Sequence, residues 1–260
     1  MLSLRAVPGD AVVRSALQTE LTGLQARRPG RQPWVLDVGG GSGAWAVPLA
    51  AAGCHVTVVD VSPEALAVLR RRADQAGVSG SITALQGDVD ALAEVADPGG
   101  ADIVLGHGLL EVVDDPAGAV RGLAGAVAPG GILSVLVAGR HAAALARALA
   151  GRLSEALAVL SGPSGRWGED DPLQRRMDAA TLCALLEAEG LLRVELLQGD
   201  GVFEALVPAS LRDGSPGTAD TLAELEALAA SDPALQQVAT RLHAIAHRVP
   251  APAAPTTAGG

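Results

Sequence analysis

The sequence predicts an α/β domain with a doubly wound parallel sheet. Short apolar segments alternate with helical segments at βαβ spacing, and this alternation requires right-handed crossovers between parallel strands. The first apolar segment, Trp34–Val38, enters a glycine-dense turn, and acidic residues stand at the ends of the first three segments: Asp37, Asp60 and Asp88. Ligands of such Rossmann-like sheets bind outside the carboxyl ends of the strands, so these acids indicate where a site lies.

Apolar spacing and helix-ending residues predict the individual elements. Residues 12–26 carry apolar side chains at helical spacing, and Pro29 with Gly30 ends that helix. Pro63 follows Ser62, a capping residue, and begins a helix that ends at Gly77. Further helices are expected at 44–51, after Pro116, at 142–160, at 179–189 and around 222–229. The seven expected strands are 34–38, 55–59, 81–86, 101–105, 132–138, 192–198 and 242–249.

The size and composition of the chain predict one domain. At 260 residues with 49% hydrophobic content, the chain can bury a substantial core. We expect a single domain over residues 1–249, with its core at 34–138 and helical lid insertions at about 141–171 and 203–239. Residues 250–260, rich in Pro, Ala, Thr and Gly, are expected to be disordered.

The net charge and the lengths of the apolar runs limit which binding partners and which cell compartment we expect. The formal net charge of -10 disfavours general binding to a phosphate backbone. The first ten residues lack the pattern of a signal peptide, and no uninterrupted apolar run of about 20 residues follows, so we expect a cytoplasmic protein without a membrane partner. The two cysteines, Cys54 and Cys183, have no zinc-type spacing, so no metal site is predicted. The sequence leaves the oligomeric state open.

The turn after the first strand, Asp37-Val38-Gly39-Gly40-Gly41-Ser42-Gly43, is the most informative segment. Glycines permit positive φ and leave no Cβ between the backbone and a ligand, so the chain can turn closely against an adenosine-bearing molecule. Asp60 follows the central glycine by about 20 residues, the separation at which a carboxylate reaches ribose hydroxyls. Gly39, Gly41 and Ala44 also fit the dinucleotide fingerprint, so the glycines alone leave a nicotinamide cofactor open.

Asp37 before this turn and Gly43 within it resemble motif I of the class I S-adenosylmethionine-dependent methyltransferases, and Pro129-Gly130-Gly131 resembles a turn common in that family. The resemblance implies the seven-stranded methyltransferase sheet and S-adenosyl-L-methionine as the cofactor. It implies that Arg14 holds the cofactor carboxylate, Asp60 the ribose and Asp88 the adenine amine. The full set implied to bind the cofactor is Arg14, Asp37, Gly39, Gly40, Gly41, Gly43, Asp60, Val61, Asp88, Val89 and His107.

Within that family, the chain most resembles the bacterial tRNA 5-carboxymethoxyuridine methyltransferases. This resemblance rests on the segment 107–116, on His141 after the fifth strand, and on segments 222–226 and 242–248. Two departures stand against it: the neutral to acidic run 161–171 replaces a basic loop, and Gly201 stands where the family has an arginine. These departures remove groups that would attract a tRNA phosphate or an anionic wobble base.

Methyl transfer from a sulfonium is an in-line displacement that mainly requires alignment of the acceptor and exclusion of water. A carboxylate acceptor needs no base, whereas a hydroxyl or amine would give its proton to one of the candidate catalytic residues, His107, Glu111 or His141. The acidic net charge and the neutral lid favour a small-molecule acceptor with an O or N acceptor atom. Three alternatives stay open: a tRNA wobble-base carboxyl methyltransferase, a catalytically inert adenosyl-binding module, and a nicotinamide oxidoreductase. Against the last, the chain contains neither Tyr nor Lys.

Overall fold

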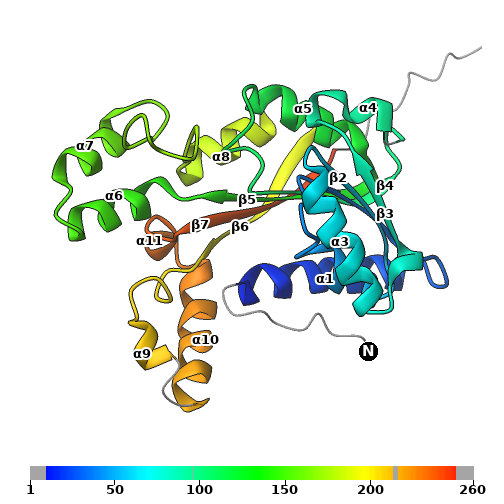
Figure 1. The fold of residues 1–260 in the computed structure, drawn as a ribbon, viewed down its shortest axis with the longest axis horizontal. Helices are drawn as coiled ribbons and strands as arrows, with labels where there is room; N and C mark the ends of the chain where they lie inside the picture. Colours follow the sequence, from blue (N-terminus) through cyan, green and yellow to red (C-terminus); the bar gives the residue numbers. More distant parts are fainter. Residues whose placement is uncertain (1–9, 96, 213–215, 250–260) are drawn as a thin grey trace, which may run out of the picture.

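The computed structural model describes residues 10–95, 97–212 and 216–249, which form a seven-stranded sheet with helices on both faces (Figure 1). The strand order is β3-β2-β1-β4-β5-β7-β6. The strands are β1 Trp34–Val38, β2 His55–Asp60, β3 Ile82–Gln86, β4 Ala101–His107, β5 Val127–Ala138, β6 Leu192–Asp200 and β7 Arg241–Arg248. This sheet confirms the predicted Rossmann-like methyltransferase fold.

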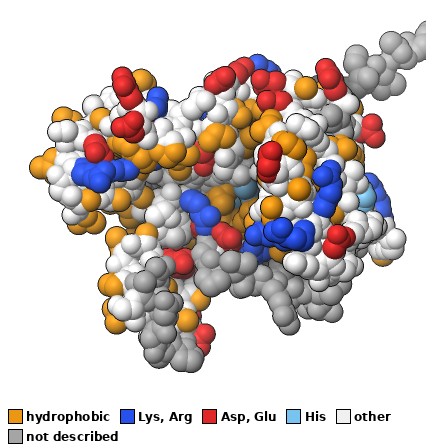
Figure 2. All heavy atoms as spheres, viewed as in Figure 1, with side chains coloured by type: hydrophobic (Ala, Val, Ile, Leu, Met, Phe, Trp, Pro, Cys, Tyr) orange, Lys and Arg blue, Asp and Glu red, His pale blue; other side chains and the backbone are white. Residues whose placement is uncertain are grey.

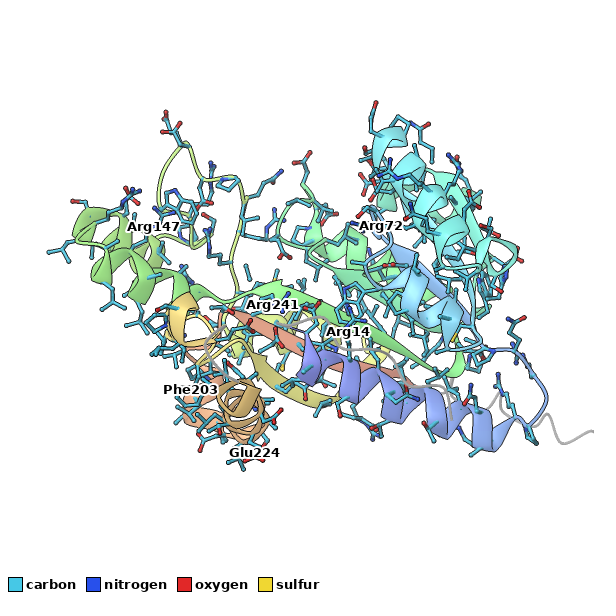
Figure 3. All side chains as sticks on the ribbon, turned by 60° about the horizontal axis from the view of Figure 1, so that its bottom comes forward. Arg14, Arg72, Arg147, Phe203, Glu224 and Arg241 are labelled. Carbon is cyan, nitrogen blue, oxygen red and sulfur yellow. The ribbon has the colours of Figure 1, made fainter. Side chains whose placement is uncertain are left out.

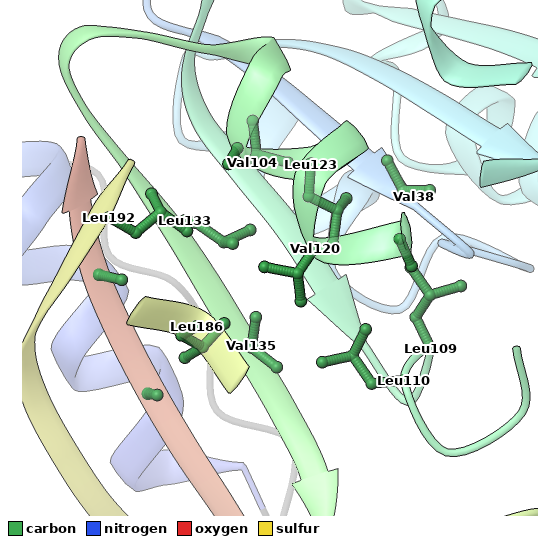
Figure 4. Close-up of a cluster of buried hydrophobic side chains, with 14 of the residues drawn as sticks. Val38, Val104, Leu109, Leu110, Val120, Leu123, Leu133, Val135, Leu186 and Leu192 are labelled. Atoms are coloured by element: carbon green, nitrogen blue, oxygen red, sulfur yellow. The ribbon is translucent and has the colours of Figure 1, made fainter. Parts of the chain in front are cut away.

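Alternate strand residues point to the two faces of the sheet, and each face has its own core. On one face, Val35 and Ile103 pack with α1 (Ala11–Arg27), α2 (Ala46–Ala51) and α3 (Pro63–Gln75). On the other face, Leu36 and Val104 pack with α5 (Pro116–Ala126) and α8 (Ala179–Glu187). Figure 4 shows part of this second core, where α5 covers β4 and β5. Helices therefore cover both faces of the sheet and exclude water from them. This explains why the central strands are continuous apolar runs in the sequence.

One strand departs from the predicted parallel sheet. β7 lies between β5 and β6 and runs antiparallel to both. Its first residue, Arg241, lies opposite Ala138 and Asp200, the last residues of the two neighbouring strands. The connection from β6 therefore returns to the sheet at the same edge where β6 ended, and β7 must run back from that edge. As a result, the start of β7 belongs to the carboxyl edge where the ligand site is expected.

Two predicted boundaries were wrong. The helix expected at 142–160 is two helices, α6 (Arg140–Leu149) and α7 (Leu153–Ser161), because the chain turns at Gly151, whose φ is +74°. The fifth strand begins at Val127 rather than at residue 132, with Pro129-Gly130-Gly131 inside it as an irregularity where the pairing with β4 shifts register. Gly130 has a φ of +74°, so the strand passes through this bulge without breaking.

The remaining elements are η1 Ser79–Ser81, η2 Val89–Ala91, α4 Leu92–Val95, α9 Ala209–Arg212, α10 Pro216–Ser231 and α11 Pro233–Gln236. Helices α9, α10 and α11 lie within the segment 203–239. The tail at 250–260, which the sequence predicts to be disordered, and the first nine residues lie outside the described part of the chain. No helix in residues 10–95, 97–212 and 216–249 has the length and apolar character needed to cross a membrane.

Candidate active site

The glycine turn after β1 is held against the end of β2 by backbone hydrogen bonds. The Gly39 amide donates to the Val59 carbonyl at 2.8 Å, and the Gly41 amide donates to Asp60 Oδ2 at 2.8 Å. The other carboxylate oxygen of Asp60, Oδ1, accepts from the Ser62 amide at 2.9 Å. Gly39 and Gly41 have φ values of +71° and +53°, which glycine adopts at little cost. Asp60 therefore orders the turn and keeps further lone pairs for a ligand.

Asp37 lies buried beneath this turn. Its side chain is 1% exposed, and a Cβ added to Gly40 would lie 2.5 Å from Asp37 Oδ2 and 2.9 Å from Val58 Cγ1. Only glycine fits at position 40 for this reason. Burial, with the charge of Asp60 as a second cause, raises the pKa of the Asp37 carboxyl from 3.8 to about 7. The Asp37 carboxyl, which the motif singled out, is therefore about half ionised near neutral pH when no cofactor is bound.

A cavity of about 410 Å³ opens at the carboxyl ends of β1, β2 and β4. Its volume falls in the range of small-molecule and cofactor pockets. Figure 2 shows the hollowed face of the molecule between the lobe formed by α6 and α7 and the part covered by α3. Five of the residues predicted to bind the cofactor line the cavity: Gly39, Asp60, Val61, Asp88 and Val89. Residues that sequence reasoning missed, among them Leu109, Val113 and Gln174, also line it.

Other predicted residues gather beside the cavity without lining it. The Arg14 guanidinium lies 4.5 Å from the centre of the Trp45 ring, and the His107 ring meets the same tryptophan edge to face at 4.8 Å between ring centres. Arg14 and Arg241 both contact Asp10, at 3.7 Å and 2.8 Å respectively. Figure 3 shows these two arginines on α1 and at the start of β7. The structure thus brings Arg14 and His107 together through Trp45, which the sequence did not single out.

Glu111 and His141 occupy different environments. Glu111 is 7% exposed; its Oε1 accepts from the Ala138 amide at 3.2 Å, and burial raises the pKa of its carboxyl. The Glu111 carbonyl accepts from the Gln174 backbone amide at 2.9 Å, which ties this loop to the segment before α8. His141 lies in the first turn of α6, where its Nδ1 is 3.1 Å from the Gln237 carbonyl oxygen. None of the three predicted catalytic residues lines the cavity, although Gly108 and Leu109, which follow His107, do.

The buried polar atoms that lack a partner test whether these residues suit S-adenosylmethionine. In the described part of the chain, six buried side-chain nitrogen or oxygen atoms have no hydrogen-bond partner. Five of the six belong to four residues predicted for the site: Arg14 Nε and Nη1, Asp37 Oδ2, His107 Nδ1 and Glu111 Oε2. Unpaired buried polar atoms are rare in proteins and costly. Donors on Arg14 and acceptors on Asp37 match the carboxylate and the ammonium group of the cofactor's methionine end, so these residues fit it.

A row of polar side chains extends from His107 across the sheet. His107 Nε2 lies 2.8 Å from Ser134 Oγ, which lies 2.8 Å from His243 Nε2. His243 Nδ1 in turn lies 2.8 Å from Gln198 Nε2. Sequence reasoning assigned no role to the last three residues. Their only local signal is a polar side chain within a strand whose neighbours are apolar.

Comparison with known proteins identifies the central part of the chain. Residues 36–135 match the protein family described as "Methyltransferase domain". A ubiquinone biosynthesis O-methyltransferase from Methylocella silvestris is 36% identical over 131 residues, which cover 48% of each chain. A tRNA 5-carboxymethoxyuridine methyltransferase from Escherichia coli is 30% identical over 118 residues, covering 45% of this chain and 44% of the relative. The chain therefore spans about half the length of the curated relatives it matches.

Solved structures support the same fold. Magnesium protoporphyrin IX methyltransferase from Synechocystis PCC 6803, determined with bound SAH, superposes with a TM-score of 0.56 and 14% identity, covering 90% of this chain and 83% of that chain. These findings confirm the predicted resemblance and the predicted fold. Residues 36–135 therefore match a methyltransferase domain, on a chain that has the fold of the S-adenosylmethionine-dependent methyltransferases.

Proposed function

We propose that this protein transfers the methyl group of S-adenosylmethionine to an oxygen or nitrogen atom of a small molecule. The coincidence of unpartnered buried polar atoms with residues chosen from the sequence carries this proposal. The fold alone would not, because one fold hosts many activities. The curated relatives named for ubiquinone biosynthesis act, by that name, as O-methyltransferases, which favours an oxygen acceptor.

In this proposal the cofactor supplies an electrophilic methyl group carried on a sulfonium sulfur. Arg14 would hold its carboxylate through Nε and Nη1, and Asp60 would accept from the ribose hydroxyls with its remaining lone pairs. The apolar cavity residues Val61, Val89 and Leu109 would exclude water from the bound molecule. Such a displacement mainly requires alignment of the acceptor and exclusion of water, and these residues would provide both.

Charge favours a small acceptor over tRNA. The charged residues that line the cavity are Asp60, Asp88, Asp90 and Asp114, and none of the described lining residues is an arginine or histidine. Acidic side chains at this place would repel a nucleic acid backbone. An arginine at position 201 is also disfavoured, because Gly201 has a φ of +72° and an added Cβ would collide with the hydroxyl of Thr240.

Two arginines beside Trp167, Arg147 and Arg176, are committed to contacts within the protein. The guanidinium groups of Arg147 and Arg176 lie 3.5 and 4.0 Å from the centre of the Trp167 ring. Arg176 also forms a buried ion pair with Asp171 at 2.6 Å, and Arg147 pairs with Glu155 at 2.8 Å. These groups order the lid and are poorly placed to bind phosphates. A tRNA methyltransferase, suggested by the Escherichia coli relative, is therefore our second candidate.

Calorimetric titration with SAH and with NADH tests the cofactor. We expect micromolar binding of SAH and none of NADH, with SAH affinity reduced at least tenfold in Asp60→Ala. Asp74→Ala is the matched control, because Asp74 lies on α3 away from the cavity and its loss should leave SAH affinity unchanged. Failure of the unmodified protein to bind SAH would contradict the proposal.

Transfer of a labelled methyl group then separates the candidate acceptors. The protein would be incubated with labelled S-adenosylmethionine and either purified bulk tRNA or the low-molecular-weight fraction of a cell extract. Label in small molecules supports the proposal, and label in tRNA supports the second candidate. Tight SAH binding with no transfer to either would point to the catalytically inert adenosyl-binding module.

A further inference from the structure

Four polar side chains form an unbroken row of hydrogen bonds from the candidate active site to α1. They come from four neighbouring strands: His107 on β4, Ser134 on β5, His243 on β7 and Gln198 on β6. Each successive pair lies 2.8 Å apart. At the far end, Gln198 Nε2 lies 3.3 Å from the Val12 carbonyl oxygen. Ser134 and His243 are fully inaccessible, Gln198 is buried and His107 is half-buried.

The Val12 carbonyl fixes the orientation of the Gln198 amide. A carbonyl oxygen only accepts hydrogen bonds, so the atom of Gln198 that faces it must be the amide nitrogen. The reversed amide would place two oxygens 3.3 Å apart with no hydrogen between them. The same nitrogen contacts His243 Nδ1, and an amide nitrogen only donates. His243 Nδ1 is therefore the acceptor of this bond.

The positions of the remaining protons follow from that acceptor. Burial, followed by the charge of Arg241, lowers the pKa of His243 to about 3, so the ring is neutral and its single proton lies on Nε2. His243 Nε2 then donates to Ser134 Oγ, and the one hydroxyl proton of Ser134 donates to His107 Nε2. Burial also lowers the pKa of His107, so that ring is neutral and its proton lies on Nδ1.

We propose that Gln198, acting through His243 and Ser134, holds His107 in its Nδ1–H tautomer, so that His107 donates a hydrogen bond to an oxygen of the methyl acceptor. The role toward the acceptor rests on the proposed function, whereas the tautomer does not. His107 Nδ1 is buried and lacks a hydrogen-bond partner among the described residues, so its proton needs an acceptor from a ligand. Gln198, His243 and Ser134 are positioning residues in this arrangement.

This assignment narrows the class of substrate. His107 Nε2 already accepts from Ser134, and His107 Nδ1 already carries a proton, so neither nitrogen can take a proton from the acceptor. With His107 as the group that contacts the acceptor atom, that atom is an oxygen that is ionised at neutral pH, such as a carboxylate or an acidic hydroxyl. A neutral alcohol or an ammonium group would need a base that His107 does not provide.

Nuclear magnetic resonance of the protein labelled with ¹⁵N-histidine measures the tautomers directly. Long-range proton–nitrogen spectra distinguish a protonated ring nitrogen from an unprotonated one, and His107→Gln and His243→Gln variants assign the signals. We expect protonated Nδ1 in His107 and protonated Nε2 in His243. Protonated Nε2 in His107 would overturn the proposal.

Gln198→Glu should reverse the whole row. A carboxylate only accepts, so His243 would carry its proton on Nδ1, Ser134 would donate to His243, and His107 would donate from Nε2. Both tautomers should therefore change together, and this change should not reach His107 in a Ser134→Ala background. Gln236→Glu is the matched control. Gln236 is also buried, but its side chain bonds only to the carbonyls of Leu197 and Ala230 in the described structure. If Gln198→Glu changes the tautomer of His243 but leaves the tautomer of His107 unchanged, the relay is contradicted.

Ligand binding and turnover separate this inference from the proposed function. With an acceptor in hand, Gln198→Glu should lower kcat/KM by about 10- to 100-fold, the effect of losing a hydrogen bond to a charged oxygen. SAH affinity should be unchanged. The predicted tautomers without SAH binding would leave the relay intact and refute the methyltransferase proposal. Unchanged kcat/KM despite reversed tautomers would refute the donor role of His107.

Discussion

Replacing Asp37 with asparagine should stabilise the protein without cofactor, and the gain should grow as the pH rises from 4 to 8. The Asp37 carboxyl is 1% exposed, and its Oδ2 has no hydrogen-bond partner in the described structure. Burial and the nearby Asp60 raise its pKa from 3.8 to about 7. Between these two values the folded protein holds a proton that the unfolded chain has released, so stability falls as the pH rises from 3.8 to 7.

The magnitude follows from this interval. At 1.36 kcal/mol for each pH unit, ionising Asp37 in the folded protein costs about 4 kcal/mol by pH 8 and about 0.5 kcal/mol at pH 4. Asparagine has nearly the same shape and no charge, so Asp37→Asn avoids this cost. Any loss caused by burying the amide should be the same at both pH values. The gain of Asp37→Asn over the unmodified protein should therefore grow by about 4 kcal/mol between pH 4 and pH 8.

Urea unfolding of both proteins at pH 4, 6 and 8, extrapolated linearly to water, measures this difference. Asp102→Asn is the matched control, because Asp102 is equally buried but accepts from Arg28 Nη1 at 2.8 Å and from the Trp34 amide at 3.0 Å. Removing that charge should destabilise the protein at pH 8. A stability difference for Asp37→Asn that does not change with pH would refute the assignment of a neutral, buried carboxyl beneath the glycine turn.

Three further predictions concern the site and its support. Gly40→Ala should cost about 1–3 kcal/mol of stability because its methyl group would meet Asp37, whereas Gly125→Ala, with no atom within 4 Å of the added Cβ, should cost nothing; thermal unfolding compares the two. Arg14→Ala should weaken SAH binding by about 10- to 100-fold in calorimetry, because the cofactor carboxylate would lose a charged donor, while Arg27→Ala at the exposed end of the same helix should leave it unchanged. Leu69→Ala should cost about 2–5 kcal/mol in urea unfolding, because Leu69 is fully buried where α3 supports the glycine turn; a cost below 1 kcal/mol would show that the turn does not depend on it.

The sequence was sufficient for the elements whose signals are local. The first strand, Trp34–Val38, has the predicted bounds, and helix α3 begins at Pro63 because Ser62 accepts from the Ala65 amide. The glycines of the turn and the acid at Asp60 are 20 residues or so apart, and a single βαβ unit brings them together. Residues within one such unit meet through short connections, which is why the contact between the glycine turn and Asp60 could be expected from the sequence.

The tertiary structure alone decided the direction of β7 and the partners of His107. The β7 segment has the same residue pattern whichever way it runs, so this pattern does not show that it enters between β5 and β6 from their carboxyl edge. Ser134 and His243 are 109 residues apart, and His243 and Gln198 are 45 apart, yet their side chains meet because β5, β7 and β6 are neighbours in the sheet. Strand order is set by the packing of helices over both faces and not by the residues of any one strand. The sequence therefore determines the acids and glycines of the site, whereas the fold determines the hydrogen-bond partners of His107 and, in our proposal, the position of its proton.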